Sequence, residues 1–156
     1  MKFTLTPELL TPFIISNALA TGILWLSFRK PNVAEGILGM LFFGAAGFNI
    51  YTAFSNPSAY QGFADTTFLP LYSEFIRGFF ARQTTVVVSA IAIGQLYIGT
   101  SMLLENLRFK LGCIAGLIFG VAIAPLGIGA AFPSTIILSL SFLVLLLKKE
   151  TSHTLT

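Results

Sequence analysis

Residues 110–149 read KLGCIAGLIFGVAIAPLGIGAAFPSTIILSLSFLVLLLKK, and this stretch decides how often the chain can cross a membrane. Between its terminal lysines, 37 consecutive residues carry no charge. As one helix they would extend about 55 Å at 1.5 Å per residue, well beyond a hydrocarbon core of about 30 Å. The middle of the stretch holds two prolines and two glycines that favour a break: Pro125, Gly127, Gly129 and Pro133. The sequence therefore predicts two short spans, at about 110–124 and 134–147.

The composition of the whole chain fits a membrane protein. Hydrophobic residues make up 55% of the chain and charged residues 10%, with a mean hydropathy of +0.86, whereas soluble domains are roughly 25% charged. Apolar runs predict three further spans, at about 11–28, 35–54 and 84–104. The net charge of +3 comes from residues at span ends and forms no basic face for nucleic acid. We expect residues 1–156 to form one all-α polytopic membrane helical bundle.

The distribution of basic residues predicts the number and direction of the crossings. Three clusters adjoin apolar runs: Arg29-Lys30, Arg108 with Lys110, and Lys148-Lys149. Lysine and arginine near span ends favour the cytoplasmic side. Five crossings place all six residues on that side, whereas four crossings with one long final helix move the last pair across. The sequence thus favours five transmembrane helices, with the N-terminus outside and the C-terminus cytoplasmic, and leaves four as the alternative.

The segment 55–82 is neither a clean span nor an ordinary loop. After Pro70, apolar residues recur at positions that share one face of a helix: Leu71, Tyr72, Phe75, Ile76, Phe79 and Phe80. This pattern is typical of an interfacial amphipathic helix, here on the exoplasmic side, or of a loop helix packed against the spans. Its aromatic face is a candidate surface for a protein partner, formed by Tyr72, Phe75, Ile76, Phe79 and Phe80.

Local signals at the first turn predict a tight hairpin. Arg29-Lys30-Pro31 stops the first helix, and Asn32 is placed to cap the second with Glu35 as its capping-box partner. The first two spans should therefore be antiparallel neighbours.

Three amide side chains inside the spans are the leading candidates for a binding site: Asn17, Asn49 and Gln95. Counting from the outer ends, Asn17 and Gln95 lie at similar depth, and Asn49 lies nearer the surface. An amide is costly in lipid, so each should face protein or a water-filled cavity. They serve either as interhelical contacts, worth about 0.6 kcal/mol per bond on average, or as a polar spot that orients a quinone-like or lipid ligand.

Gly112, Gly116 and Gly120 form a ridge of small residues along the fourth span. Such a ridge permits close backbone approach. The partner is another span of the same chain or another subunit, and the first is favoured.

The usual catalytic and metal-binding patterns are missing from the sequence. His153 is the single histidine and lies in the polar tail, while Cys113 stands alone in an apolar run and can form no internal disulfide. No glycine-rich phosphate loop or nucleophile–histidine–acid set can be assembled. Asp65 and Glu74 are most simply solvated surface residues. We therefore identify no catalytic residue, metal site or cofactor, and a quinone or lipid is the ligand class that the spans would suit.

Residues 35–147 resemble the DoxX-like family of small bacterial integral membrane proteins. The resemblance rests on three groups of residues: Gly36-Ile-Leu-Gly39 through Gly44 and Gly47, the connector Phe68-Leu-Pro70-Leu-Tyr72, and Gly94-Gln95-Leu-Tyr-Ile-Gly99 followed by Leu104-Glu-Asn-Leu-Arg108. The first span is an addition, and Gln95 stands where the family usually has an acidic residue. The resemblance implies an inner-membrane location, a link to quinone-dependent redox complexes in some relatives, and a binding role at Gln95.

Two classes of function follow. The first is a non-catalytic membrane subunit or anchor of a larger complex, which binds a protein partner or a second copy through its exoplasmic aromatic segment. The second is a lipid- or quinone-binding carrier that uses the pocket of intramembrane amides. Membrane lipids surround the chain in both cases.

The five-span topology predicts which engineered cysteines a membrane-impermeant thiol reagent can reach from outside. A Ser58→Cys variant should be labelled and a Thr151→Cys variant should not, because the two positions lie on opposite sides of the bilayer. Labelling of both from the same side would contradict five crossings and support a single bent final helix.

Overall fold

The computed structural model describes the backbone over residues 7–154 and the side chains over residues 10–149. This part of the chain is helical and contains no strand. Five helices are long: α1 (Pro7–Arg29), α2 (Pro31–Ser55), α5 (Ala81–Ser101), α6 (Asn106–Ile123) and α7 (Ser134–Thr154). Among the described residues, four stretches are long and apolar enough to cross a membrane: Leu10–Arg29, Pro31–Ser55, Pro70–Ser101 and Asn106–Leu126. The all-α membrane-type fold is therefore confirmed, while α7 is not among these four.

The long helices close into a ring. Helix α1 packs against α2 and α7, α2 packs against α5, α5 against α6, and α6 against α7. Buried apolar side chains from all five fill the middle, among them Ile23, Leu38, Ile98, Cys113 and Leu145. The outer faces are also apolar, since Met40, Tyr51, Phe54 and Ile93 are each more than 60% exposed. A water-soluble monomer rarely shows so much contiguous apolar surface, and lipid is the solvent that suits it.

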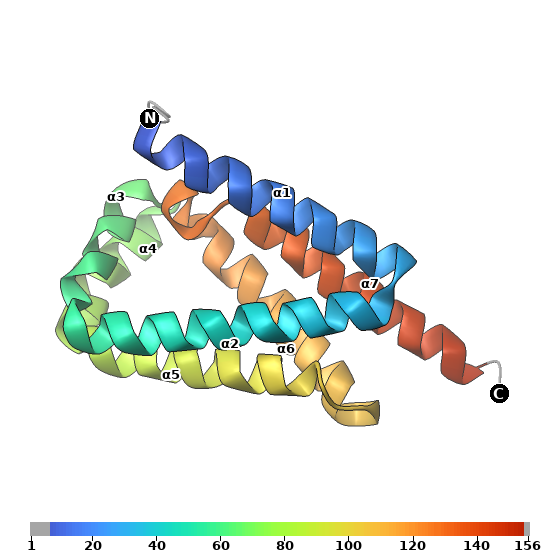
Figure 1. Cartoon of the computed structure of the whole chain (residues 1–156). Coiled ribbons are helices and arrows are strands. Elements are labelled where there is room, and N and C mark those ends of the chain that lie inside the picture. The colour runs from blue at the N-terminus through green and yellow to red at the C-terminus, as the bar shows by residue number, and fades with distance from the viewer. Residues whose placement is uncertain (1–6, 155–156) are drawn as a thin grey trace.

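The chain runs back and forth between two ends of this ring (Figure 1). One, the connector end, holds residues 56–80 and 124–133. The other, the basic end, holds the α1–α2 turn, the α5–α6 turn and the end of α7. There Lys149 Nζ lies 3.5 Å from Glu35 Oε2 and 3.9 Å from the centre of the Phe109 ring, and Lys148 Nζ donates to the Phe28 carbonyl. The three basic clusters thus gather at one end of the molecule.

The predicted capping box at the first turn is wrong. Helix α2 begins at Pro31, two residues earlier than a cap at Asn32 would allow, and its N-cap residue Lys30 makes no side-chain capping bond. Proline suits this first helical position because its missing N–H is not needed there. Glu35 is consequently free of the turn and faces Lys149 instead.

The segment between α2 and α5 is helical but is not one separate amphipathic helix, which corrects the prediction for residues 55–82. It consists of a 3-10 helix η1 (Pro57–Gly62), the short helices α3 (Phe63–Thr66) and α4 (Pro70–Phe75), and a π-helix η2 (Ile76–Phe80) that runs directly into α5. The π-turn changes the angle between successive side chains, so the residues of the predicted apolar face do not all point the same way. Ile76 and Phe80 are buried, whereas Leu71 and Phe79 are exposed.

The predicted break in the last apolar stretch is present between α6 and α7. Two single-turn 3-10 helices, η3 (Ala124–Leu126) and η4 (Ile128–Ala130), occupy it, with Gly127 between them at φ +84°. The connector satisfies the carbonyl groups that the break leaves open. Thr67 Oγ1 and the Phe68 N–H donate to the Pro125 carbonyl at 2.7 and 2.9 Å, and Thr66 Oγ1 donates to that of Leu126 at 2.9 Å.

The glycines of α6 make close approaches within the chain. A Cβ atom at Gly112 would overlap Ser101 of α5, and one at Gly116 would lie 2.6 Å from the Phe142 ring of α7. At Gly120 a Cβ would overlap the Ser139 hydroxyl and lie 2.8 Å from the Thr135 carbonyl oxygen. The ridge therefore faces α5 and α7 rather than another subunit.

Gly120→Ala should destabilise the fold because the contact at Thr135 is with backbone, which cannot move aside as a side chain can. Overpacking of this kind costs about 1–3 kcal/mol. The free energy of unfolding can be measured by denaturant titration in mixed micelles. Gly44→Ala is the matched control: its Cβ would meet nothing within 4 Å, so this change should be neutral or slightly stabilising. Equal effects of the two variants would contradict tight α6–α7 packing.

Candidate functional site

Two of the three predicted amides meet between α2 and α5. Asn49 Nδ2 donates to Gln95 Oε1 at 2.8 Å. A third residue joins them from η1, because the Tyr60 hydroxyl donates to Asn49 Oδ1 at 2.9 Å and lies 3.3 Å from the Asn49 carbonyl oxygen. The expected difference in depth between Asn49 and Gln95 is therefore wrong: the antiparallel α2 and α5 bring the two side chains to one level.

Tyr60 is a hydrogen-bond donor to Asn49. Burial raises the pKa of its phenol above the ordinary value, with a smaller opposing effect from a hydrogen bond with Thr52. The phenol therefore stays protonated at neutral pH, and its O–H is available to Asn49. Tyr60 is not among the residues predicted from the sequence, since a tyrosine beside a turn gives no periodic signal. A tyrosine within reach of an intramembrane asparagine is the clue that could have found it.

These polar groups open onto a cavity of about 410 Å³ near the connector end. Asn49, Tyr60 and Gln95 line one part of it, and the rest is mainly apolar. The aromatic members of the lining come from α3, α4, η2 and α6: Phe63, Tyr72, Phe75, Phe80 and Phe119. An apolar cavity of this size with a few convergent polar groups is the common form of a small-molecule site.

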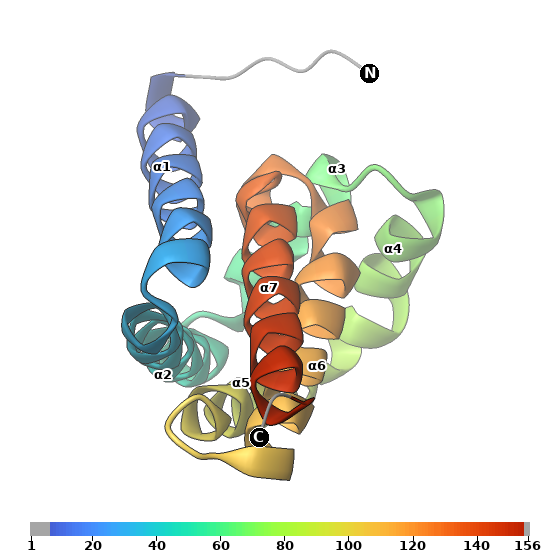
Figure 2. The same cartoon turned by 90° about the vertical axis from the view of Figure 1, so that its right-hand side faces the viewer.

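The cavity lies between the connector and α6. Figure 2 shows α4 beside α6, on the side of the molecule away from α1. The Tyr72 hydroxyl of α4 donates to the Ala122 carbonyl of α6 at 2.8 Å and so bridges the two walls. The π-helix η2 supplies Ile76 and Phe80 to the lining. Single π-turns occur frequently at functional sites.

Asn17 is placed elsewhere and does not line this cavity. Its Nδ2 donates to the Phe13 carbonyl one turn back along α1 at 2.8 Å. Its Oδ1 is buried without a hydrogen-bond partner in the described structure. The expected group of three amides is thus a pair, with Tyr60 as its third member.

Four of the five residues expected to form a partner surface line the cavity instead: Tyr72, Phe75, Ile76 and Phe80. Ile76 and Phe80 are buried and present no surface to a partner. Phe79 is exposed and lies outside the cavity lining. A partner role for the exposed residues of this segment stays a prediction.

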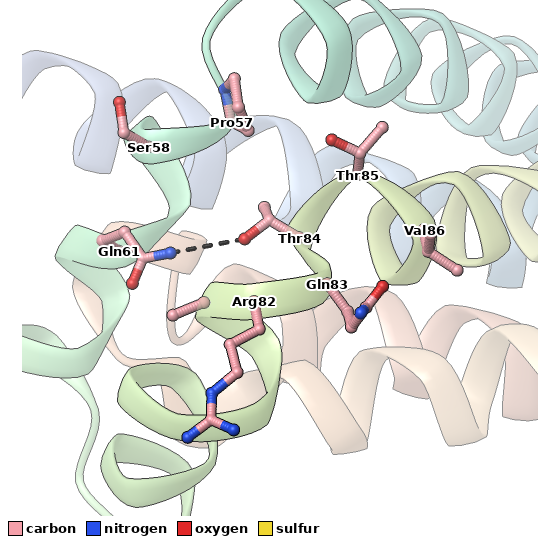
Figure 3. A pocket seen from close by; sticks show the side chains of 9 residues that line it. Pro57, Ser58, Gln61, Arg82, Gln83, Thr84, Thr85 and Val86 are labelled. Atoms are coloured by element: carbon pink, nitrogen blue, oxygen red, sulfur yellow. Dashed lines mark hydrogen bonds between the residues drawn. The ribbon is translucent and has the colours of Figure 1, made fainter.

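A second hollow, of about 390 Å³, lies at the start of α5 and is open and polar (Figure 3). Two of its hydrogen-bonding side chains, Gln61 and Thr84, are bonded to each other. Gln61 Nε2 donates to Thr84 Oγ1 at 3.4 Å, and Thr84 Oγ1 donates to the Phe80 carbonyl at 2.8 Å. Gln83 has non-helical dihedral angles here and kinks the helix. This hollow marks the polar edge of the bundle, and the aromatic cavity is the stronger site.

Within the described residues, no group of three or more His, Cys, Asp or Glu side chains is placed to hold a metal ion. Cys113 is buried in the core of the ring. Searches against protein-family models, curated proteins and solved structures find no match to this chain. The function is therefore argued from the cavity itself.

Gln95→Leu should leave the fold intact. The change removes one interhelical hydrogen bond, worth about 0.6 kcal/mol on average in membranes, and places an apolar side chain beside apolar neighbours. We expect the free energy of unfolding in mixed micelles to change by about 1 kcal/mol or less. A loss several times larger would show that the Asn49–Gln95 pair is a principal element of stability.

Proposed function

We propose that this protein is a multi-pass membrane protein that binds an apolar small molecule, a lipid or a quinone, in the aromatic cavity. The observation that carries the proposal is the cavity: apolar walls of suitable volume converge on buried polar groups from α2, α5 and η1. A packed bundle held together only by interhelical hydrogen bonds would have no need of such a space. The family assignment to DoxX-like proteins and a redox link remain parts of this proposal.

We further propose that α7 is a fifth span. It runs beside α1 from the connector end to the basic end. Five crossings place Arg29, Lys30, Arg108, Lys110, Lys148 and Lys149 on one side, which is then the cytoplasmic side. The apolar part of α7 is short, and residues 124–133 would contribute to the crossing because the carbonyls of Pro125 and Leu126 are bonded to the connector. The N-terminus is then outside, in a bacterial inner membrane.

In this orientation the cavity belongs to the outer leaflet. The side where α4 faces α6, which the Tyr72–Ala122 hydrogen bond spans, would give a lipid-soluble molecule a lateral route into it. Delivery from the bilayer favours ligands with an apolar tail. Binding without chemistry is sufficient for this role, and we assign no catalytic residue.

One observation favours a second function, that of a membrane subunit that binds a partner protein. Leu71, Phe75 and Phe79 are exposed on the connector segment, outside the ring of long helices. In the proposed topology they lie at the outer membrane surface, where a partner protein or a second copy could cover them. The two functions are compatible, because Leu71 and Phe79 are exposed and do not line the cavity.

Ala122→Phe tests the proposed function by filling the cavity. Ala122 lines it, and a phenyl group there would occupy space that a ligand needs, while the backbone carbonyl that binds Tyr72 is retained. The protein should be extracted in mild detergent and its bound small molecules identified by mass spectrometry. We expect the wild type to carry a lipid or quinone and Ala122→Phe to lose most of it.

Val121→Phe is the matched control, since Val121 is the neighbouring residue, is 50% exposed and does not line the cavity. This variant should retain the ligand of the wild type. Equal ligand content in all three proteins would exclude the cavity as the binding site and leave the membrane-subunit function.

A further inference from the structure

The Gln95 amide has one half that is bonded and one half that is not. Its Oε1 accepts from Asn49, whereas its Nε2 has no hydrogen-bond partner in the described structure. Gln95 is only 4% exposed, yet it lines the aromatic cavity. An amide N–H in apolar surroundings is costly when it is unpaired. This nitrogen is therefore available to donate a hydrogen bond to a group inside the cavity.

The two amides and Tyr60 form one chain of hydrogen bonds. The Tyr60 hydroxyl donates to Asn49 Oδ1 and lies 3.3 Å from the Asn49 carbonyl oxygen. The Asn49 NH₂ group faces Gln95 and donates to an acceptor there. Gln95 Oε1 fills that role, and its NH₂ group is left for the cavity.

We infer that the ligand presents a neutral carbonyl oxygen to Gln95 Nε2, with its apolar body against Phe75, Phe80 and Phe119. This inference rests on the proposed function and specifies its ligand. A carbonyl oxygen fits because it accepts a hydrogen bond and carries no proton of its own, so it needs only the donor that Gln95 Nε2 supplies.

An anionic head group fits poorly, because no lysine, arginine or histidine of the described part of the chain lines the cavity to balance its charge. The same carbonyl chemistry occurs in a quinone ring and in the ester of a glycerolipid. In the proposed topology both would reach the cavity from the bilayer.

The test measures binding of three probes to the full-length protein in nanodiscs by titration calorimetry: a decyl-substituted 1,4-benzoquinone, 1,2-didecanoylglycerol and decylbenzene. The first two carry carbonyl groups and the third carries none. Comparing variants for each probe removes the contribution of partitioning into lipid. We expect Gln95→Leu to weaken at least one carbonyl probe by roughly two- to tenfold, the effect of one net hydrogen bond, and to leave decylbenzene unchanged or tighter.

Asn17→Leu is the matched control, because it makes the comparable amide-to-leucine change at a residue that does not line the cavity. It should alter no probe. Gln95→Met, which preserves the length of the side chain, replaces Gln95→Leu if the latter does not fold. Loss of affinity for the quinone alone assigns a ring carbonyl as the acceptor, and loss for the diester alone assigns a glycerolipid.

Gln95 variants that bind both carbonyl probes as tightly as the wild type would overturn the inference. If the Gln95 variants behave in this way but Ala122→Phe abolishes decylbenzene binding, the cavity is still supported as an apolar site. Failure of all three probes to bind the wild type would overturn the proposed function together with the inference.

Discussion

The fold depends on how the carbonyl groups at the break between α6 and α7 are satisfied. A low-dielectric environment provides no water for open backbone groups, so the protein must bond them itself. Here the connector supplies the donors: Thr66, Thr67 and the Phe68 N–H bind the carbonyls of Pro125 and Leu126, and Tyr72 binds that of Ala122. These hydrogen bonds hold the connector against the bundle, and they satisfy the carbonyl groups that the break leaves without helical partners.

The cavity is a consequence of that arrangement. The bonds at Thr66 and Thr67 hold α3 against the break, and the Tyr72 bond holds α4 at the side of α6. Gly127 permits the close approach, since a Cβ there would overlap the Thr66 carbonyl and its φ of +84° suits glycine. The π-helix then returns the chain into α5 with Ile76 and Phe80 directed inward. The space between these elements and α6 is where the amide pair is accessible.

The sequence predicted the features that follow from length and charge. A run of 37 uncharged residues is too long for one span, and the prolines and glycines in it indicated where it would break. The same reasoning could not predict the connector. Helical periodicity assumes 3.6 residues per turn, and the π-turn at Ile76–Phe80 alters the phase within the segment to which the pattern was applied.

Only part of the site was predicted, for a similar reason. Asn49 and Gln95 were identified because amides are costly in lipid, which is a property of each residue alone. Their pairing, the recruitment of Tyr60 and the separation of Asn17 depend on how α2 lies against α5 and on the fold of η1. Counting residues from the predicted span ends could not give that register. The capping box was also predicted wrongly, because α2 begins at Pro31 and Glu35 lies beside Lys149, which is far along the chain.

The closed floor of the cavity favours a binding site over a passage through the membrane. Phe119 lines the cavity and packs edge-on against Phe42 at a ring separation of 5.8 Å, and Phe42 meets Phe142 in the same way at 5.5 Å. Below these rings, Leu38, Met102 and Phe109 continue the buried core toward the basic end. Gly112 and Gly116 bring α6 close to α5 and α7 at this level. A molecule that enters from the connector end therefore meets dense packing at mid-bundle.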